Sequence, residues 1–203
     1  MAAASPLTRI KQGLDDLPGW LATLDDAELG EALIETREVI DRGEAVFASG
    51  VRRFETSGQY RADGALSVIA WLRSNCKLSG GAAAERVEVA RALDQLPKTE
   101  EAFARGDVGY QHVAVMARAA EHVGVAAVQK AEASLLQAAE TMDPGQFTGV
   151  AKHFEHRVDA AAALAEANRA HERRYLHVSE PMDGLVAWMD CWMPKAAPSC
   201  APP

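Results

Sequence analysis

The chain has 203 residues, of which 48% are hydrophobic and 25% charged, and its formal net charge is −8 at pH 7. This composition excludes a largely disordered chain and provides enough residues for one domain with a core. The acidic balance disfavours a broad electrostatic contact with phosphates, which supplies most non-specific affinity for DNA.

Targeting and ligand signals are weak throughout the chain. No apolar run approaches the roughly 20 residues that cross a bilayer, and the N-terminal residues lack the basic and apolar regions of a secretory signal. We therefore expect a cytoplasmic protein with no membrane partner. Cys76, Cys191 and Cys200 fit neither a disulfide framework nor the paired spacing of zinc ligands, so we expect no metal site.

The first part of the chain predicts two helices. Residues 1–22 are expected to form a short helix and a connector, with the helix ending near Pro18 and Gly19. A long helix then begins at Thr23 or Asp25 and ends near Gly58. Its apolar residues recur at heptad-like spacing, which predicts one stripe that faces a partner helix. The stripe consists of Leu29, Leu33, Ile40, Phe47, Val51 and Phe54.

Residues 63–120 predict two consecutive units that resemble helix-turn-helix motifs. The first unit begins with a short helix whose apolar side includes Leu66, Ile69, Ala70 and Leu72. After a turn at residues 77–79, Ser79 is expected to cap a second helix, because its hydroxyl accepts a hydrogen bond from a free backbone N–H. The apolar face of that second helix consists of Ala83, Val87, Ala90 and Leu93.

The second unit repeats this outline more loosely. Thr99 is expected to cap a helix over residues 100–105, and Gly106 is expected to end it. Another helix resumes at Tyr110, and Glu121 to Gly124 breaks the pattern. Residues 125–140 are rich in alanine and predict a further helix.

Two interpretations of these units remain open. A DNA-binding motif would turn Arg86 and Arg91 of the second helix toward phosphate or base. Plain helical packing is the preferred interpretation, because any helical hairpin with a short loop has the same outline.

The C-terminal part predicts one more long helix and a pair of strands. Asp143, followed by proline, glycine and Gln146, is typical of a capped helix start, and this helix is expected to run to about Arg173 and pair with the first long helix. Residues 175–179 and 185–189 alternate like strands around a turn at 181–184. The expected fold is therefore mainly α: two long helices, short helix-turn-helix-like units and a small C-terminal β-hairpin.

The residue pattern contains no recognisable catalytic constellation. His153 and His156 lie three apart on a predicted helix, but no third metal ligand accompanies them. The acidic pairs Asp15–Asp16 and Asp25–Asp26 are adjacent residues, which point apart on a helix. We expect no catalytic residue, no cofactor and no small-molecule substrate.

An ordered series of short motifs runs from about Leu29 to Asp190. It consists of Asp63–Gly64, Ala70–Leu72, Leu78–Ser79, Arg86–Val87, Ala90–Leu93, Leu96–Pro97, Phe103–Gly106, His112–Val113, Leu176–Ser179 and Asp183–Val186. In this series the chain resembles the actinobacterial 13E12 repeat family, which carries domain of unknown function 222. In complete members of that family this helical region precedes an HNH nuclease domain, so the resemblance implies a DNA-associated element.

The chain departs from that family after the predicted hairpin, where no nuclease motif follows. Residues 191–203 lack periodicity and resemble a gene read in the wrong frame. A shift of one nucleotide after Asp190 turns Cys191 and the next residues into Leu-Leu-Asp-Ala whichever synonymous codons are used. We therefore hypothesise that a frameshift removed the nuclease half; a natural disordered tail is the alternative, and the gene sequence distinguishes them.

These observations predict four segments: an N-terminal arm over residues 1–22, a helical domain over 23–174, a β-hairpin over 175–190 and a disordered, out-of-frame tail over 191–203. The expected function is that of a non-catalytic, truncated relative of HNH-endonuclease-associated proteins, with DNA as a partner. One alternative is a structural module that self-associates through its long helices, using Leu33, Ile40, Phe154 and Val158. Another is a fragment of an HNH endonuclease whose catalytic half is missing.

Overall fold

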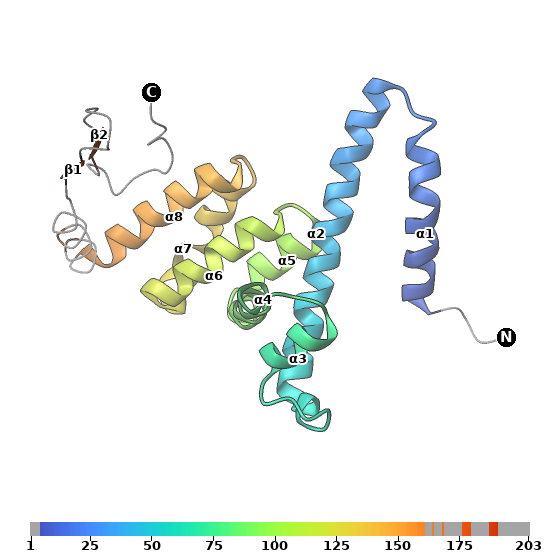
Figure 1. The fold of residues 1–203 in the computed structure, drawn as a ribbon, viewed down its shortest axis with the longest axis horizontal. Helices are drawn as coiled ribbons and strands as arrows, with labels where there is room; N and C mark the ends of the chain where they lie inside the picture. The colour runs from blue at the N-terminus through green and yellow to red at the C-terminus, as the bar shows by residue number, and fades with distance from the viewer. Residues whose placement is uncertain (1–4, 161–163, 165–167, 169–175, 180–186, 191–203) are drawn as a thin grey trace. The chain divides into compact units, whose positions relative to one another are not determined.

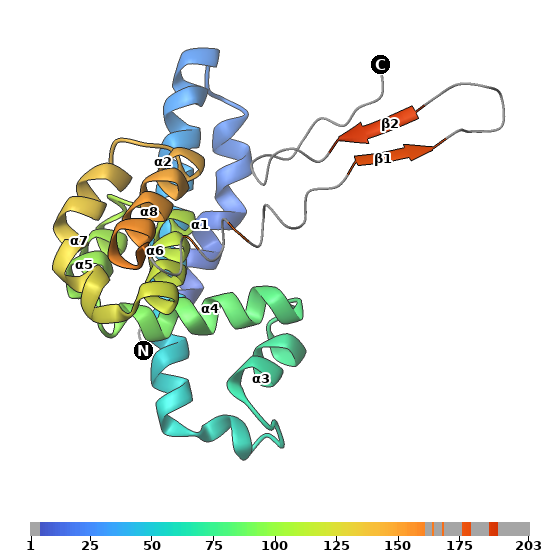
Figure 2. The same cartoon turned by 90° about the vertical axis from the view of Figure 1, so that its left-hand side faces the viewer.

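The computed structural model describes residues 5–160, 164, 168, 176–179 and 187–190. Its ribbon is shown in two views in Figures 1 and 2. The helices are α1 (Pro6–Leu21), α2 (Asp26–Ser57), a 3-10 turn η1 (Gln59–Arg61), α3 (Val68–Asn75), α4 (Gly80–Leu93), α5 (Pro97–Arg105), α6 (Tyr110–Val123), α7 (Val125–Ala139) and α8 (Pro144–Val158), and the strands are β1 (Leu176–Ser179) and β2 (Ala187–Asp190).

The predicted fold class, mainly α with an appended β-hairpin, was wrong. Residues 5–160 contain only α-helices and one 3-10 turn, so the part of the fold that has a core is all α. The four-residue strands β1 and β2 pair only with each other. Two strands of this length form no layer of their own, and the predicted turn at 181–184 lies outside the described residues.

Capping signals read from the sequence are confirmed at several helix ends. The Asp25 carboxylate accepts hydrogen bonds from the N–H groups of Ala27 and Glu28, both at 2.9 Å, while the Glu28 carboxylate accepts from the Asp25 N–H at 3.0 Å. Ser79 Oγ accepts from the Ala82 N–H at 3.2 Å. Asp143 likewise caps α8. Short-range polar contacts therefore set these boundaries.

Four local predictions need correction. Leu66 precedes α3 and is 96% exposed, and the buried residues of that helix are Val68 and Leu72. Thr99 is no cap, because α5 begins two residues before it at Pro97, whose fixed φ suits a first turn. The helix α1 continues through Pro18 to Leu21, although Pro18 supplies no N–H to the helix. The helix α8 ends at Val158, before a break at Asp159, rather than near residue 173; most of residues 161–173 lie outside the described residues.

The core of the first unit is built around α4. This helix packs against α2, α3, α5 and α6, and Figures 1 and 2 show it crossing α2 rather than running along it. The predicted face is confirmed, since Ala83, Val87, Ala90 and Leu93 are each at most 3% exposed. Val89 on another side of α4 is also fully buried. Because several helices cover α4, little of it is left on the surface.

The helix α2 is packed along only part of its length. Its buried residues are Ala32, Asp41, Ala48 and Val51, so three of the four lie from Asp41, at the middle of the helix, onward. The predicted partner of α2 was α8, but in the described residues α2 packs against α3, α4, α5 and α6. The N-terminal part of its predicted stripe remains exposed, including Leu33 and Ile40.

The chain divides into two units, residues 1–150 and 151–203, and α8 crosses the division. The first unit holds α1 to α7, the start of α8 and the core just described. The second unit holds the end of α8 and the two strands.

Candidate functional site

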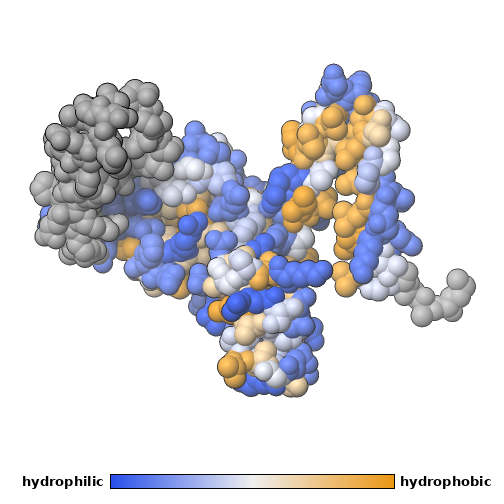
Figure 3. Space-filling model, in the orientation of Figure 1, coloured by the Kyte–Doolittle hydropathy of each residue, from blue (hydrophilic) through white to orange (hydrophobic). Residues whose placement is uncertain are grey.

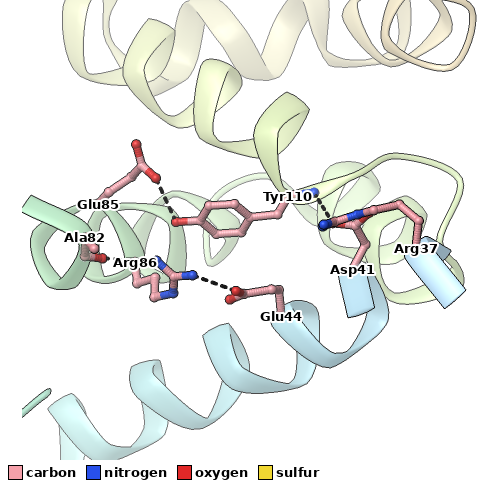
Figure 4. Close-up of polar contacts among 7 residues, drawn as sticks. All are labelled: Arg37, Asp41, Glu44, Ala82, Glu85, Arg86 and Tyr110. Carbon is pink, nitrogen blue, oxygen red and sulfur yellow. Dashed lines mark hydrogen bonds and ion pairs between the residues drawn. The ribbon is translucent and has the colours of Figure 1, made fainter. Parts of the chain in front are cut away.

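Arg86, one of the two arginines predicted to contact DNA, lies in an intramolecular ion pair. Its Nη2 donates to Oε1 of Glu44 on α2 at 2.6 Å, and the two side chains are 20% and 23% exposed. The guanidinium carbon also lies 5.0 Å from the centre of the Tyr110 ring. Figure 4 shows this arrangement between α2, α4 and α6. Arg86 therefore joins three helices; its role in DNA contact stays a prediction.

Arg91, the second of these arginines, pairs with Glu55 near the end of α2. Its Nε donates to Oε2 of Glu55 at 3.0 Å, and its Nη2 contacts the other carboxylate oxygen. Arg91 is 60% exposed, so the ion pair lies at the surface and adds little to stability. The structure thus brings both arginines of α4 to glutamates of α2 rather than to each other.

Tyr110 lies at the first residue of α6 and extends this polar cluster. Its hydroxyl donates to Oε1 of Glu85 at 3.1 Å. Burial, together with the nearby Glu85 carboxylate, raises the pKa of the Tyr110 phenol. A shallow pocket of about 400 Å³ opens beside these two residues and is also lined by Arg118 and Thr148. The phenol therefore stays protonated and acts as a hydrogen-bond donor.

Asp41 fixes the start of α6 from the middle of α2. Its Oδ1 accepts from the backbone N–H of Tyr110 at 2.9 Å, and its Oδ2 accepts from Nε of Arg37 at 2.8 Å. Burial alone would raise the pKa of the carboxyl, but the bonds from Arg37 and Tyr110 outweigh it and hold the pKa of Asp41 below its ordinary value. Asp41 therefore acts as a capping carboxylate supplied by another helix.

Sequence reasoning missed the partners in this cluster because they lie far apart in the chain. Glu44 and Arg86 are 42 residues apart, and Asp41 and Tyr110 are 69 apart. A local pattern carries no signal for such pairs. The glycine before Tyr110 was the available hint, since a Cβ at Gly109 would lie 3.1 Å from Oδ2 of Asp41.

A second surface feature is an apolar face on α1 and on the N-terminal half of α2. None of the residues of α1 is buried. Figure 3 shows apolar residues gathered over these two helices. Eight large apolar residues of these two helices are between 46% and 69% exposed. They are Leu7, Ile10, Leu14 and Trp20 on α1, and Leu33, Ile34, Val39 and Ile40 on α2.

This apolar face continues into a groove beside α2. The groove has a volume of about 360 Å³, and Ile40 lines it together with Phe47, Cys76 and Leu78. Glu44 and Arg86 form its polar border. The ion pair between Glu44 and Arg86 therefore lies next to the exposed apolar face.

A comparison with models of protein families identifies the family of this chain. The model of the family described as Domain of unknown function (DUF222) matches residues 30–198. The chain belongs to the DUF222 family. A search of curated proteins and a search of solved structures each gave no significant match.

The match covers the helices of the DUF222 domain from α2 onward, while α1 precedes it. It also reaches past Asp190, so it includes most of the segment that the frameshift hypothesis assigns to another reading frame. That segment lies outside the described residues, and the hypothesis stays a prediction.

The histidines of α8 lie on the surface of this DUF222 chain. His153 and His156 are both exposed. Within the described ranges, no group of three or more His, Cys, Asp or Glu residues has the arrangement needed to hold a metal ion. In the same ranges, none of the helices combines the length and the apolar character needed to cross a bilayer.

Proposed function

We propose that this DUF222 chain is a non-catalytic interaction module that binds another protein chain through the apolar face of α1 and the N-terminal half of α2. The observation that carries the proposal is the exposure of the eight large apolar residues on that face. Contiguous exposed apolar surface is characteristic of protein-interaction sites. Covering the exposed half of each side chain would contribute roughly 1 kcal/mol.

The remainder of the body supports a scaffold role. Arg86 is paired with Glu44, and Tyr110 is paired with Glu85, so the polar groups near the centre satisfy one another. These contacts hold α2, α4 and α6 together and thereby present the N-terminal half of α2 from a packed base.

Photocrosslinking in cells tests this function even when the partner is unidentified. The photoreactive residue p-benzoylphenylalanine replaces Leu14 or Ile34 on the proposed face, or Leu66, which is 96% exposed but lies outside both helices. We expect discrete protein adducts from the first two positions and none from Leu66. Equal labelling from all three positions, or no adduct from Leu14 and Ile34, would contradict the proposal.

DNA association, with a relationship to HNH-endonuclease proteins, is the second candidate. The consecutive helices α3 and α4, joined by residues 76–79, favour it. The engagement of Arg86 and Arg91 with Glu44 and Glu55 disfavours it. A gel-shift experiment at low and moderate salt decides between the candidates. A retarded band that Arg91→Ala weakens would support DNA binding, and the absence of a band at both salt concentrations would exclude it.

A further inference from the structure

The occupant of the apolar face can be inferred from the pattern of α1. Its apolar residues Leu7, Ile10, Leu14, Leu17 and Leu21 are spaced alternately three and four apart. This is the a and d spacing of a heptad, which forms a continuous seam on one side of a helix. The seam has no buried residue within a single chain. A helix that matches this seam is therefore needed to cover it.

We infer that the partner is a second copy of this chain, with the two α1 helices packed against each other at the centre of a four-helix bundle. This inference rests on the proposed function. In an antiparallel pair, the a positions of one helix lie opposite the d positions of the other, so Leu7 would face Leu17 of the partner subunit and Ile10 would face Leu14 of the partner subunit. In a parallel pair, each seam residue would face its own copy. The seam therefore matches itself in either direction.

The second helix of each copy completes the bundle. The first half of α2 carries the exposed residues Leu33, Ile34, Val39 and Ile40, and four helices can enclose a shared apolar core. The 16 residues of α1 span about 24 Å, and two adjacent helices are about 20 Å wide, so the face covers roughly 500 Å² in projection. This area lies near the lower end of specific interfaces, so we expect a reversible dimer with a Kd of about 1–100 µM.

Sedimentation equilibrium of the purified full chain tests the inference. We expect a mass that rises with concentration from 21.7 kDa toward twice that value. The double variant Ile10→Glu/Leu14→Glu is expected to stay monomeric, with a Kd at least about 100-fold weaker, since it would bury four carboxylates. Both residues are more than half exposed in one chain, so its circular dichroism and thermal unfolding should match the wild type at concentrations where both are monomeric. Leu66→Glu is the matched control and should dimerise normally.

The outcomes separate this inference from the proposed function. A purified chain that remains monomeric at all concentrations would overturn self-association. Adducts from Leu14 and Ile34 with a different protein in cells would then still support the interaction module. The absence of both a dimer and specific adducts would overturn both proposals.

Discussion

Glu132 on α7 accepts two hydrogen bonds from Thr99 in the first turn of α5. One comes from the backbone N–H at 2.8 Å and one from the hydroxyl at 2.9 Å, both to Oε1. The N-cap position of α5 is Leu96, whose side chain cannot accept a hydrogen bond. Glu132 therefore supplies from another helix the cap that the local sequence lacks, at the end of α5 where the helix dipole favours a carboxylate.

Removal of this carboxylate should destabilise the body. Glu132 is 2% exposed and Thr99 is fully buried, so Glu132→Ala leaves a buried N–H and a buried hydroxyl without this acceptor. We expect the free energy of unfolding to fall by about 2–4 kcal/mol, and by less in Glu132→Gln, whose amide oxygen still accepts. Urea unfolding measures the change. Glu140→Ala, at the exposed end of α7, is the control, and an equal effect there would refute this account.

The planar shape of the Arg86 guanidinium should contribute as much to the stability of the fold as its charge does. The guanidinium binds Glu44 and lies over the Tyr110 ring at once, which an ammonium group reproduces poorly. We expect Arg86→Lys to lower the free energy of unfolding by about 1–2 kcal/mol, and Arg86→Ala by about 2–4 kcal/mol. Thermal denaturation followed by circular dichroism measures both. Arg91→Lys, in the exposed pair with Glu55, should change the value by less than about 0.5 kcal/mol.

The capping contact of Asp41 predicts a dependence of stability on acid. The pKa of Asp41 is lower in the folded chain than its ordinary value of 3.8, so the folded state holds the proton less tightly than the unfolded state. Its contribution is therefore fully present well above pH 3.8 and is lost as the pH falls through the folded pKa. Asp41→Asn should be less stable than the wild type by about 1–3 kcal/mol at neutral pH. That difference should shrink in acid, and a constant difference from pH 7 to pH 3 would contradict the assignment.

Replacement by alanine should change the stability of the chain in opposite directions at two glycines with different surroundings. Gly106 ends α5 with φ at 91°, and an added Cβ would lie 2.6 Å from Cγ of Glu38. Gly106→Ala should therefore cost about 1–2 kcal/mol. Gly43 lies within α2, and nothing lies within 4 Å of its added Cβ, so Gly43→Ala should stabilise the chain by about 0.5–1 kcal/mol. Differential scanning calorimetry of the two variants gives the sign directly, and the same sign in both would show that the backbone argument fails.

The sequence predicted what depends on neighbours along the chain. The caps at Asp25, Ser79 and Asp143 involve residues two or three apart, and the buried face of α4 follows from helical periodicity alone. Partners across the fold were not predictable in this way. The heptad-like stripe of α2 correctly indicated an apolar side, but spacing does not say which helix, or which chain, covers it.

The candidate site illustrates the same limit. A helix-turn-helix outline places Arg86 and Arg91 toward DNA, and no local pattern marks Glu44 and Glu55 of the long helix as their partners. The contacts between α4 and α2 depend on how the helices cross, which a single sequence does not reveal. The seam of α1 follows from local spacing, since four of its five residues precede Pro18, whereas the helix or chain that covers it does not.

The uneven packing of α2 gives one continuous helix two different local stabilities. From Asp41 onward its buried residues anchor it to the body, whereas before Asp41 only Ala32 is buried. Amide hydrogens in the first half should therefore exchange with deuterium through local fraying, and those in the second half only when the whole body opens. A single 32-residue helix, about 48 Å long, would thus have a boundary near its middle between amides that exchange fast and amides that exchange slowly. Any chain that covers the first half would move that boundary toward the N-terminus.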